Sequence, residues 1–99
     1  MLKIAKESEN GNGLIELSGE LDTSSAIEFS SAIEGFLDDL DTLTIDMKNL
    51  ECITSAGLRI LLNIEQTMED KGGLKIINVN DDVMDVFEVS GFTEVLNIQ

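Results

Sequence analysis

The chain has 99 residues, 42% of them hydrophobic, and its 20 acidic residues against six Lys and Arg give a formal charge of −14. This length predicts one domain, residues 1–99, with a small buried core. This negative charge argues against binding to nucleic acid, which needs clustered Lys and Arg, and against binding to an anionic membrane surface. A basic patch on a protein partner is a better match for it. The acidity also has a simpler explanation, which is that it confers solubility.

Two short strands are expected at the start of the chain. Leu2, Ile4 and Ala5 suggest the first strand, and residues 14–17 read as the second. The segment Glu-Asn-Gly-Asn-Gly at 9–13 is a strong turn signal between them. The two strands are therefore predicted to form a hairpin.

The first helix is predicted from a capping pattern and from apolar spacing. Ser25-Ala-Ile-Glu28 matches a capping box, in which Ser25 and Glu28 satisfy each other's backbone donors. The helix is expected to end in the Asp-rich run 38–41. Its apolar residues recur at helical spacing: Ala26, Phe29, Ile33, Phe36 and Leu37.

A short alternating strand at 43–47 is followed by a second helix, predicted from about Ala56 to Lys71. Lys71-Gly-Gly73 supplies a cation in the last turn and a left-handed glycine at its end. One face of this helix is apolar except at Glu65, and it carries Leu58, Leu61, Leu62, Glu65 and Met68.

The last third of the chain predicts a strand at 74–79, a third helix and a short strand at 95–98. Asp81 or Asp82 is expected to cap the helix, and Ser90-Gly91 to end it. The helix carries Val83, Val86, Phe87 and Val89. The order β-β-α-β-α-β-α-β predicts an α/β fold with a mixed sheet that opens with a hairpin and has helices packed on it.

Cys52 is the only cysteine, so no internal disulfide is possible, which fits a reducing compartment. The N-terminal residues lack the long apolar region of a signal peptide, and no apolar run approaches membrane-spanning length. We therefore expect a cytoplasmic protein.

The residues offer little for catalysis. Histidine is absent, so neither a Ser-His-Asp nor a Cys-His pairing can form, and a metal site is not expected. The chain has no Walker A motif and no G-x-G-x-x-G, and we expect no cofactor. The pairs Asp38/Asp39 and Asp81/Asp82 are better explained as solvated helix ends than as acid–base carboxylates. The chain is therefore predicted not to be an enzyme.

Thr54 and Ser55 stand between a strand and a helix, at a point where unsatisfied N–H groups stabilise a phosphate. With no catalytic group nearby, the turn resembles a substrate for another enzyme. Simple capping by one hydroxyl is the plainer explanation from the residues alone. Arg59 lies four residues after Ser55 and either shares its side of the helix, within reach of such a phosphate, or is an ordinary exposed side chain.

Five ordered segments resemble a known family. Together they are similar to a single STAS domain of the bacterial anti-sigma factor antagonist type, over nearly the whole chain. The segments are Leu17-Ser-Gly-Glu-Leu-Asp22, Leu43-Thr-Ile-Asp46, Ile53-Thr-Ser-Ala-Gly-Leu58, Lys71-Gly-Gly-Leu-Lys-Ile76 and Val86-Phe-Glu-Val-Ser-Gly-Phe92.

The resemblance implies a partner switch. Family members bind an anti-sigma factor that is also a serine kinase, and this binding releases a sigma factor. The kinase phosphorylates the Ser before the helix, which aligns with Ser55, and a serine phosphatase resets it. Where the family often has Asp before that Ser and Ser or Thr after it, this chain has Thr54 and Ala56.

The face that binds the partner is expected to combine the end of the second strand with the start of the second helix. We expect a monomer that binds neither nucleic acid nor membrane. The predicted partner-binding residues are Asp22, Thr23, Thr54, Ser55, Gly57 and Arg59.

Two alternatives remain open at this point. One is a STAS interaction module in a transporter-associated or stressosome-like complex, in which Ser55 only caps its helix. The other is an enzyme or small-ligand carrier, against which the missing histidine, Walker motif and metal ligands argue.

Overall fold

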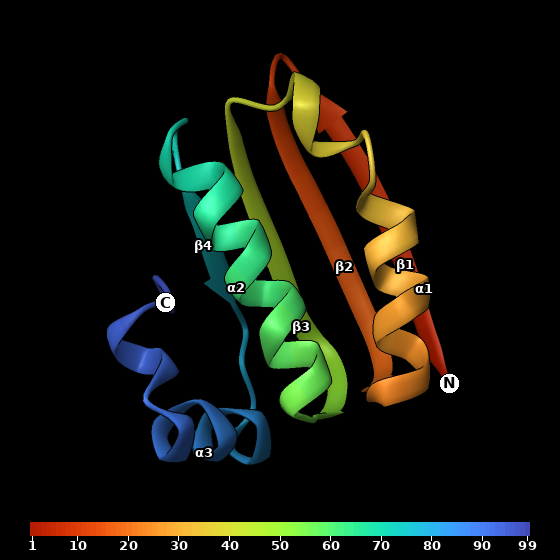
Figure 1. Cartoon of the computed structure of the whole chain (residues 1–99), viewed down its shortest axis with the longest axis vertical. Coiled ribbons are helices and arrows are strands. Elements are labelled where there is room, and N and C mark those ends of the chain that lie inside the picture. Colours follow the sequence, from red (N-terminus) through yellow and green to blue (C-terminus); the bar gives the residue numbers. More distant parts are fainter.

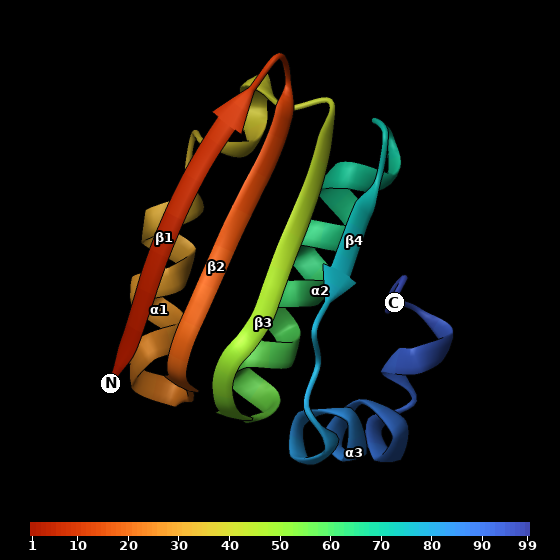
Figure 2. The same ribbon diagram turned by 180° about the vertical axis from the view of Figure 1, so that it is seen from behind.

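A four-stranded mixed sheet forms the centre of the molecule in the computed structural model, which describes residues 1–99. In space the strands follow the order β1-β2-β3-β4 (Figure 2). β1 pairs antiparallel with β2, and the other two pairs are parallel, which confirms the expected hairpin and mixed sheet. The strand bounds are β1 (Leu2–Glu9), β2 (Asn12–Leu21), β3 (Thr42–Ile53) and β4 (Leu74–Ile77).

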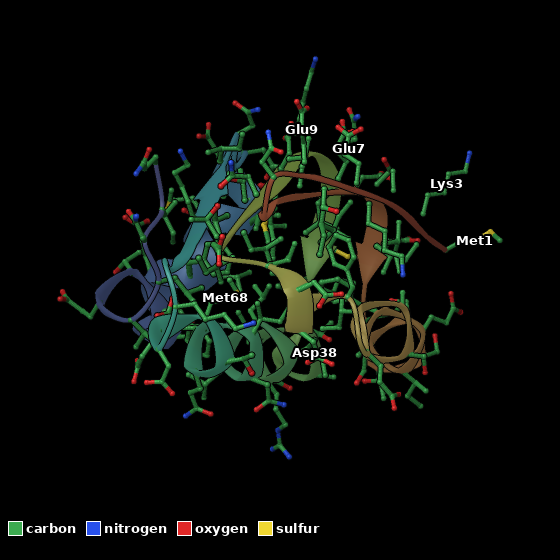
Figure 3. The ribbon with its side chains drawn as sticks, turned by 90° about the horizontal axis from the view of Figure 1, so that it is seen from above. Met1, Lys3, Glu7, Glu9, Asp38 and Met68 are labelled. Carbon is green, nitrogen blue, oxygen red and sulfur yellow. The ribbon has the colours of Figure 1, made fainter.

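Two helices, α1 (Thr23–Ile33) and α2 (Ser55–Glu69), lie side by side on one face of the sheet (Figure 1). The third, α3 (Asp81–Ser90), lies at the edge where β2 and β3 end. The opposite face of the sheet carries no helix, and Glu7 and Glu9 point away from the helices there (Figure 3). None of the helices is long and apolar enough to span a membrane.

The core lies between the sheet and the helices α1 and α2. Alternate strand residues point to opposite faces of a sheet, so one set of them faces these helices. Met68 of α2 lies on the inner side of that helix (Figure 3) and is completely buried. The strands and helices also bury Ile15, Leu17, Leu43, Ile45, Met47, Phe29, Leu61 and Ile64.

Several elements have other bounds than the sequence predicts, and α1 and β3 are two of them. α1 ends at Ile33, because Gly35 adopts a φ of 81° and turns the chain. Leu37 then begins a short 3₁₀ helix, η1 (Leu37–Asp39), and packs into the core from there. β3 continues to Ile53, and two register shifts in its pairing with β2 accommodate the additional residues.

Two predictions, about the start of the third helix and about the closing strand, are wrong in detail. Asn80, and neither Asp81 nor Asp82, caps α3, because its side chain accepts the Val83 N–H. The expected closing strand at 95–98 is instead a 3₁₀ turn, η2 (Phe92–Glu94), followed by a single bridge from Ile98 to Ile76.

Lys71, the cation expected in the last turn of α2, makes its hydrogen bonds to another part of the chain. The Lys71 ammonium donates to the carbonyls of Leu37 and Asp38 and so fastens η1 to the end of α2. The left-handed glycine is confirmed, since Gly73 has a φ of 98°.

Candidate functional site

The ends of two neighbouring parallel strands meet at one edge of the sheet. Leu21, the last residue of β2, is the register partner of Ile53, the last residue of β3. The Thr54 N–H donates to the Leu21 carbonyl at 3.0 Å, which ties the two strand ends together. Asp22 and Thr54 each follow one of these ends, so α1 and α2 begin side by side (Figure 1).

Asp22 caps α1, and the expected capping box is therefore placed wrongly. One oxygen, Oδ1, accepts the N–H groups of Ser24 and Ser25 at 3.1 and 3.0 Å. Ser25 stands at the third helical position, and its hydroxyl accepts the Asp22 N–H at 2.9 Å. The box thus runs from Asp22 to Ser25, and not from Ser25 to Glu28.

The Asp22 carboxylate leaves one oxygen uncommitted. The hydroxyls of Ser24 and Ser25 also lie 3.0 and 3.1 Å from Oδ1, whereas Oδ2 makes no hydrogen bond. The hydrogen bond from the Ser25 N–H, followed by those from the two hydroxyls, lowers the pKa of Asp22 below its ordinary value. Asp22 therefore keeps a negative charge and an acceptor oxygen available on a half-buried side chain.

Thr54 precedes α2 as its N-cap residue, but its hydroxyl makes no capping hydrogen bond. Its carbonyl accepts the Leu58 N–H at 3.0 Å, which begins the helical pattern. Ser55 is the first helical residue, and both Thr54 and Ser55 are exposed. The explanation of Thr54 as a side-chain cap is therefore not supported, and the first N–H groups of α2 receive no side-chain partner from it.

Gly57 lies beneath this surface and is buried. A Cβ at this position would come within 2.7 Å of Leu21 Cγ and 2.9 Å of Ile53 Cγ1. A glycine is therefore required for the first turn of α2 to pack this closely on the two strand ends.

One groove runs between α1 and α2. Its volume is about 510 Å³, and it is lined by hydroxyls, aliphatic side chains and one guanidinium group, with no carboxylate. We call it the α1–α2 groove; Thr23, Ser55 and Arg59 line it together with Ala26, Ile27, Ser30, Ser31, Ala56 and Ile60.

A second, shallower groove runs between α2 and α3 and also includes Ser55. Its volume is about 390 Å³, and Asp85 is the only charged residue along it. We call it the α2–α3 groove; its other residues are Ile53, Thr54, Leu58, Val86, Val89 and Ser90. Ser55 therefore stands on the ridge between two grooves of different charge.

The structure brings the predicted site residues to one edge, apart from the buried Gly57. Two exposed aliphatic side chains were missed by sequence reasoning: Ile27 is 70% exposed and Val89 is 90% exposed. The sequence signal for Ile27 is its position off the apolar stripe of Ala26, Phe29 and Ile33. Val89 gives no such signal, because it matches the spacing of a helix core. No group of three His, Cys, Asp or Glu side chains is arranged to hold a metal ion.

Known proteins share both the sequence pattern and the fold. The anti-sigma F factor antagonist of Paenibacillus polymyxa is 29% identical over 102 residues, covering 98% of this chain and 86% of the relative. An anti-sigma factor antagonist from Mycobacterium paratuberculosis superposes with a TM-score of 0.89 at 21% identity, over 99% of this chain and 85% of the other.

Two solved structures of SpoIIAA, an anti-sigma factor antagonist, also share this fold. The unphosphorylated form has a TM-score of 0.81 at 22% identity, over 98% of this chain and 88% of the other. The phosphorylated form has a TM-score of 0.74 at 21% identity, over 98% of this chain and 91% of the other.

The family itself is established by a match that covers almost the whole sequence. The family model described as "Mlab, STAS domain" matches residues 4–97. The four-stranded mixed sheet and its helices agree with that match. The chain belongs to the STAS domain family.

Proposed function

We propose that residues 1–99 form a STAS domain that acts as an anti-sigma factor antagonist: it binds an anti-sigma factor that is also a serine kinase, and so releases a sigma factor. Phosphorylation of Ser55 by that kinase ends the binding, and a serine phosphatase restores it. The relatives named as anti-sigma factor antagonists support the general function. The protein acts as a regulator and not as an enzyme.

The observation that carries the proposal is the position of Ser55. Its side chain is exposed at the first residue of α2, beside the edge where β2 and β3 end. A kinase can therefore reach the hydroxyl without unfolding any element. A partner that covers this edge buries the same hydroxyl, so modification and binding compete for one surface.

A phosphate at this position is compatible with the folded protein. It adds roughly −1.5 to −2 charge at neutral pH. The N-terminus of α2 stabilises negative charge through its free N–H groups, which Thr54 leaves uncapped. In an interface, however, the same charge must lose its water, and a cost of about 3 kcal/mol weakens binding by roughly two orders of magnitude.

The proposed partner-binding face consists of the exposed or half-buried residues at this edge: Asp22, Thr23, Thr54, Ser55 and Arg59. Asp22 offers its free Oδ2 to a donor of the partner. Gly57 acts from below, because its missing side chain allows α2 to pack close to the strand ends.

The formal charge of −14 favours a protein partner over nucleic acid or an anionic membrane. We propose that the protein works as a cytoplasmic monomer. The lone Cys52 is exposed and free, which suits a reducing compartment.

A second candidate function is a STAS interaction module in a transporter-associated or stressosome-like complex, with Ser55 never phosphorylated. The observation that favours it is Thr54, which stands where antagonists of this type often have Asp. In that case Ser55 serves only as the first residue of α2.

Phosphorylation by the cognate kinase distinguishes the two functions. The wild-type protein and Ser55→Ala are incubated with the kinase and ATP, and the products are mapped by mass spectrometry. We expect one phosphate on Ser55 in the wild type and none in the variant. Phosphate on Ser24, Ser25 or Thr54 alone would refute Ser55 as the site. A protein that binds no ATP-dependent kinase and copurifies with a membrane complex would support the second function.

A further inference from the structure

We propose that the α1–α2 groove binds an acidic and aliphatic segment of the anti-sigma partner: an aliphatic side chain between Ile27 and Ile60, and a carboxylate at Arg59. This inference rests on the proposed function and names the chemistry that the partner presents. It adds the groove between the helices to the sheet edge already described.

The charge of the groove is the first argument. The chain carries 20 carboxylate side chains, yet none of them lines this groove, and Arg59 is its only charged residue. Arg59 forms no salt bridge within the chain, so its guanidinium remains free for a partner. An acidic segment is repelled by most of the charges on this protein and attracted by Arg59, which favours docking in this groove.

The α2–α3 groove supplies a contrast within the same molecule. Its only charged residue is Asp85, and α3 also carries Asp81, Asp82 and Glu88 with no cation. That groove disfavours an acidic segment, although it exposes the aliphatic side chain of Val89. Charge therefore assigns the acidic segment to the groove between α1 and α2.

The aliphatic residues of the α1–α2 groove are the second argument. Ile27 is one of four large hydrophobic side chains that the protein exposes. Across the groove, Ile60 is half-buried and packs against the core. Covering the two removes apolar surface from water, which favours binding independently of charge.

Asp22 and Arg59 give the partner segment a direction. Asp22 carries a negative charge and a free acceptor oxygen at the start of α1, next to Thr23 of the groove. Arg59 carries a positive charge one turn into α2. The carboxylate of the segment therefore lies at Arg59, and a donor group of the partner lies at Asp22.

The same charges explain why modification at Ser55 ends binding. A phosphate with a charge of roughly −1.5 to −2, placed beside Arg59, changes the net charge of the groove from positive to negative. An acidic segment then meets like charge at its docking place. The α2 N-terminus stabilises the phosphate in the free protein, so the reversal opposes binding without opposing folding.

Isothermal titration with the purified anti-sigma factor kinase tests the charge of the groove. Arg59→Glu is compared with Lys75→Glu, an exposed lysine on β4 outside the groove, since both substitutions move the formal charge of −14 by the same two units. We expect Arg59→Glu to weaken binding at least about tenfold and Lys75→Glu to change it less than about twofold. Circular dichroism verifies that both variants fold.

A second pair of variants tests the aliphatic contact. Ile27→Ala is compared with Val89→Ala, because both residues are exposed but only Ile27 lines the α1–α2 groove. We expect about a fivefold or larger loss of affinity for Ile27→Ala and less than a twofold change for Val89→Ala. Similar effects of the two would overturn the assignment of this groove.

The outcomes separate this inference from the proposed function. A wild-type protein that does not bind the anti-sigma factor refutes the function, and the inference with it. Binding that Arg59→Glu and Lys75→Glu affect equally refutes the groove alone. Tighter binding of Arg59→Glu would mean a basic occupant, and a dimer of the free chain that Ile27→Ala dissociates would mean a second copy; either result overturns the inference.

Discussion

Replacing Gly57 by alanine tests how closely α2 must approach the strand ends. In most exposed helix positions this substitution stabilises a protein, by up to about 1 kcal/mol in a helix interior. Here the gain is smaller, because Gly57 stands in the first turn of α2. The new methyl group would lie 2.7 Å from Leu21 Cγ and 2.9 Å from Ile53 Cγ1, which is too close for carbon atoms.

Neither neighbour can move away easily. Leu21 is completely buried and Ile53 is 4% exposed, so any movement disturbs the packing around them. Overfilling a packed core costs about 1–3 kcal/mol, which exceeds the gain in helix propensity. We expect a net loss of about 1 kcal/mol and, for a domain of this size, a melting temperature lower by roughly 4–8 °C.

Thermal and urea unfolding of Gly57→Ala measure this loss. Asn63→Ala serves as the control, since Asn63 is exposed on the same helix and gains propensity without a clash. The control should melt at or above the wild-type temperature. If Gly57→Ala is stabilised as much as the control, Leu21 and Ile53 relax freely, and the close approach is not a requirement of the fold.

Two further predictions concern titratable side chains. Burial, and then the charge of Glu69, raises the pKa of Glu65, so the contribution of Glu65 to stability is present at low pH and is lost as the pH rises through the raised pKa. In urea unfolding, Glu65→Gln should therefore stabilise the fold at pH 7 and have little effect near pH 4. A larger effect at the lower pH would contradict this. Hydrogen bonds lower the pKa of Asp22, so its contribution is present above the unfolded-state value and lost as the pH falls through the folded one. Asp22→Asn keeps the capping oxygen but loses this charge, so it should melt between the wild type and Asp22→Ala at neutral pH and bind the partner more weakly. Equal melting of the two variants would exclude a role for the capping oxygen.

The sequence predicts the helices and strands because their apolar residues follow clear periods. It fails where two patterns compete for the same residues. Ser25-x-x-Glu28 and Asp22-x-x-Ser25 both match a capping box, and only the path of the chain out of β2 selects the second. That path brings the Glu20 carbonyl to 2.7 Å from the Ser25 hydroxyl, so Ser25 is buried and cannot begin the helix.

The sequence suggests only part of the proposed partner-binding face, for a similar reason. It singles out Asp22 and Ser55 because each follows a recognisable strand or motif. The grooves were not found, because they depend on the spacing between helices that are separate in the sequence. The end of β3 was also not predicted, because the polar residues Lys48, Asn49 and Glu51 interrupt the alternation of apolar and polar residues. Register shifts in this part of β3 allow it to stay paired with β2 despite that interruption.

The pairing of β2 with β3 means that the proposed binding face combines residues from two distant stretches of the chain. The register joins Asn12 with Thr42 and Leu21 with Ile53, so paired residues are 30 to 32 positions apart. Closing a loop of that length costs conformational entropy before the contacts across it form. A fragment that begins after Asp22 can therefore still hold Ser55, but it presents only part of the surface that we propose a partner meets on the intact chain.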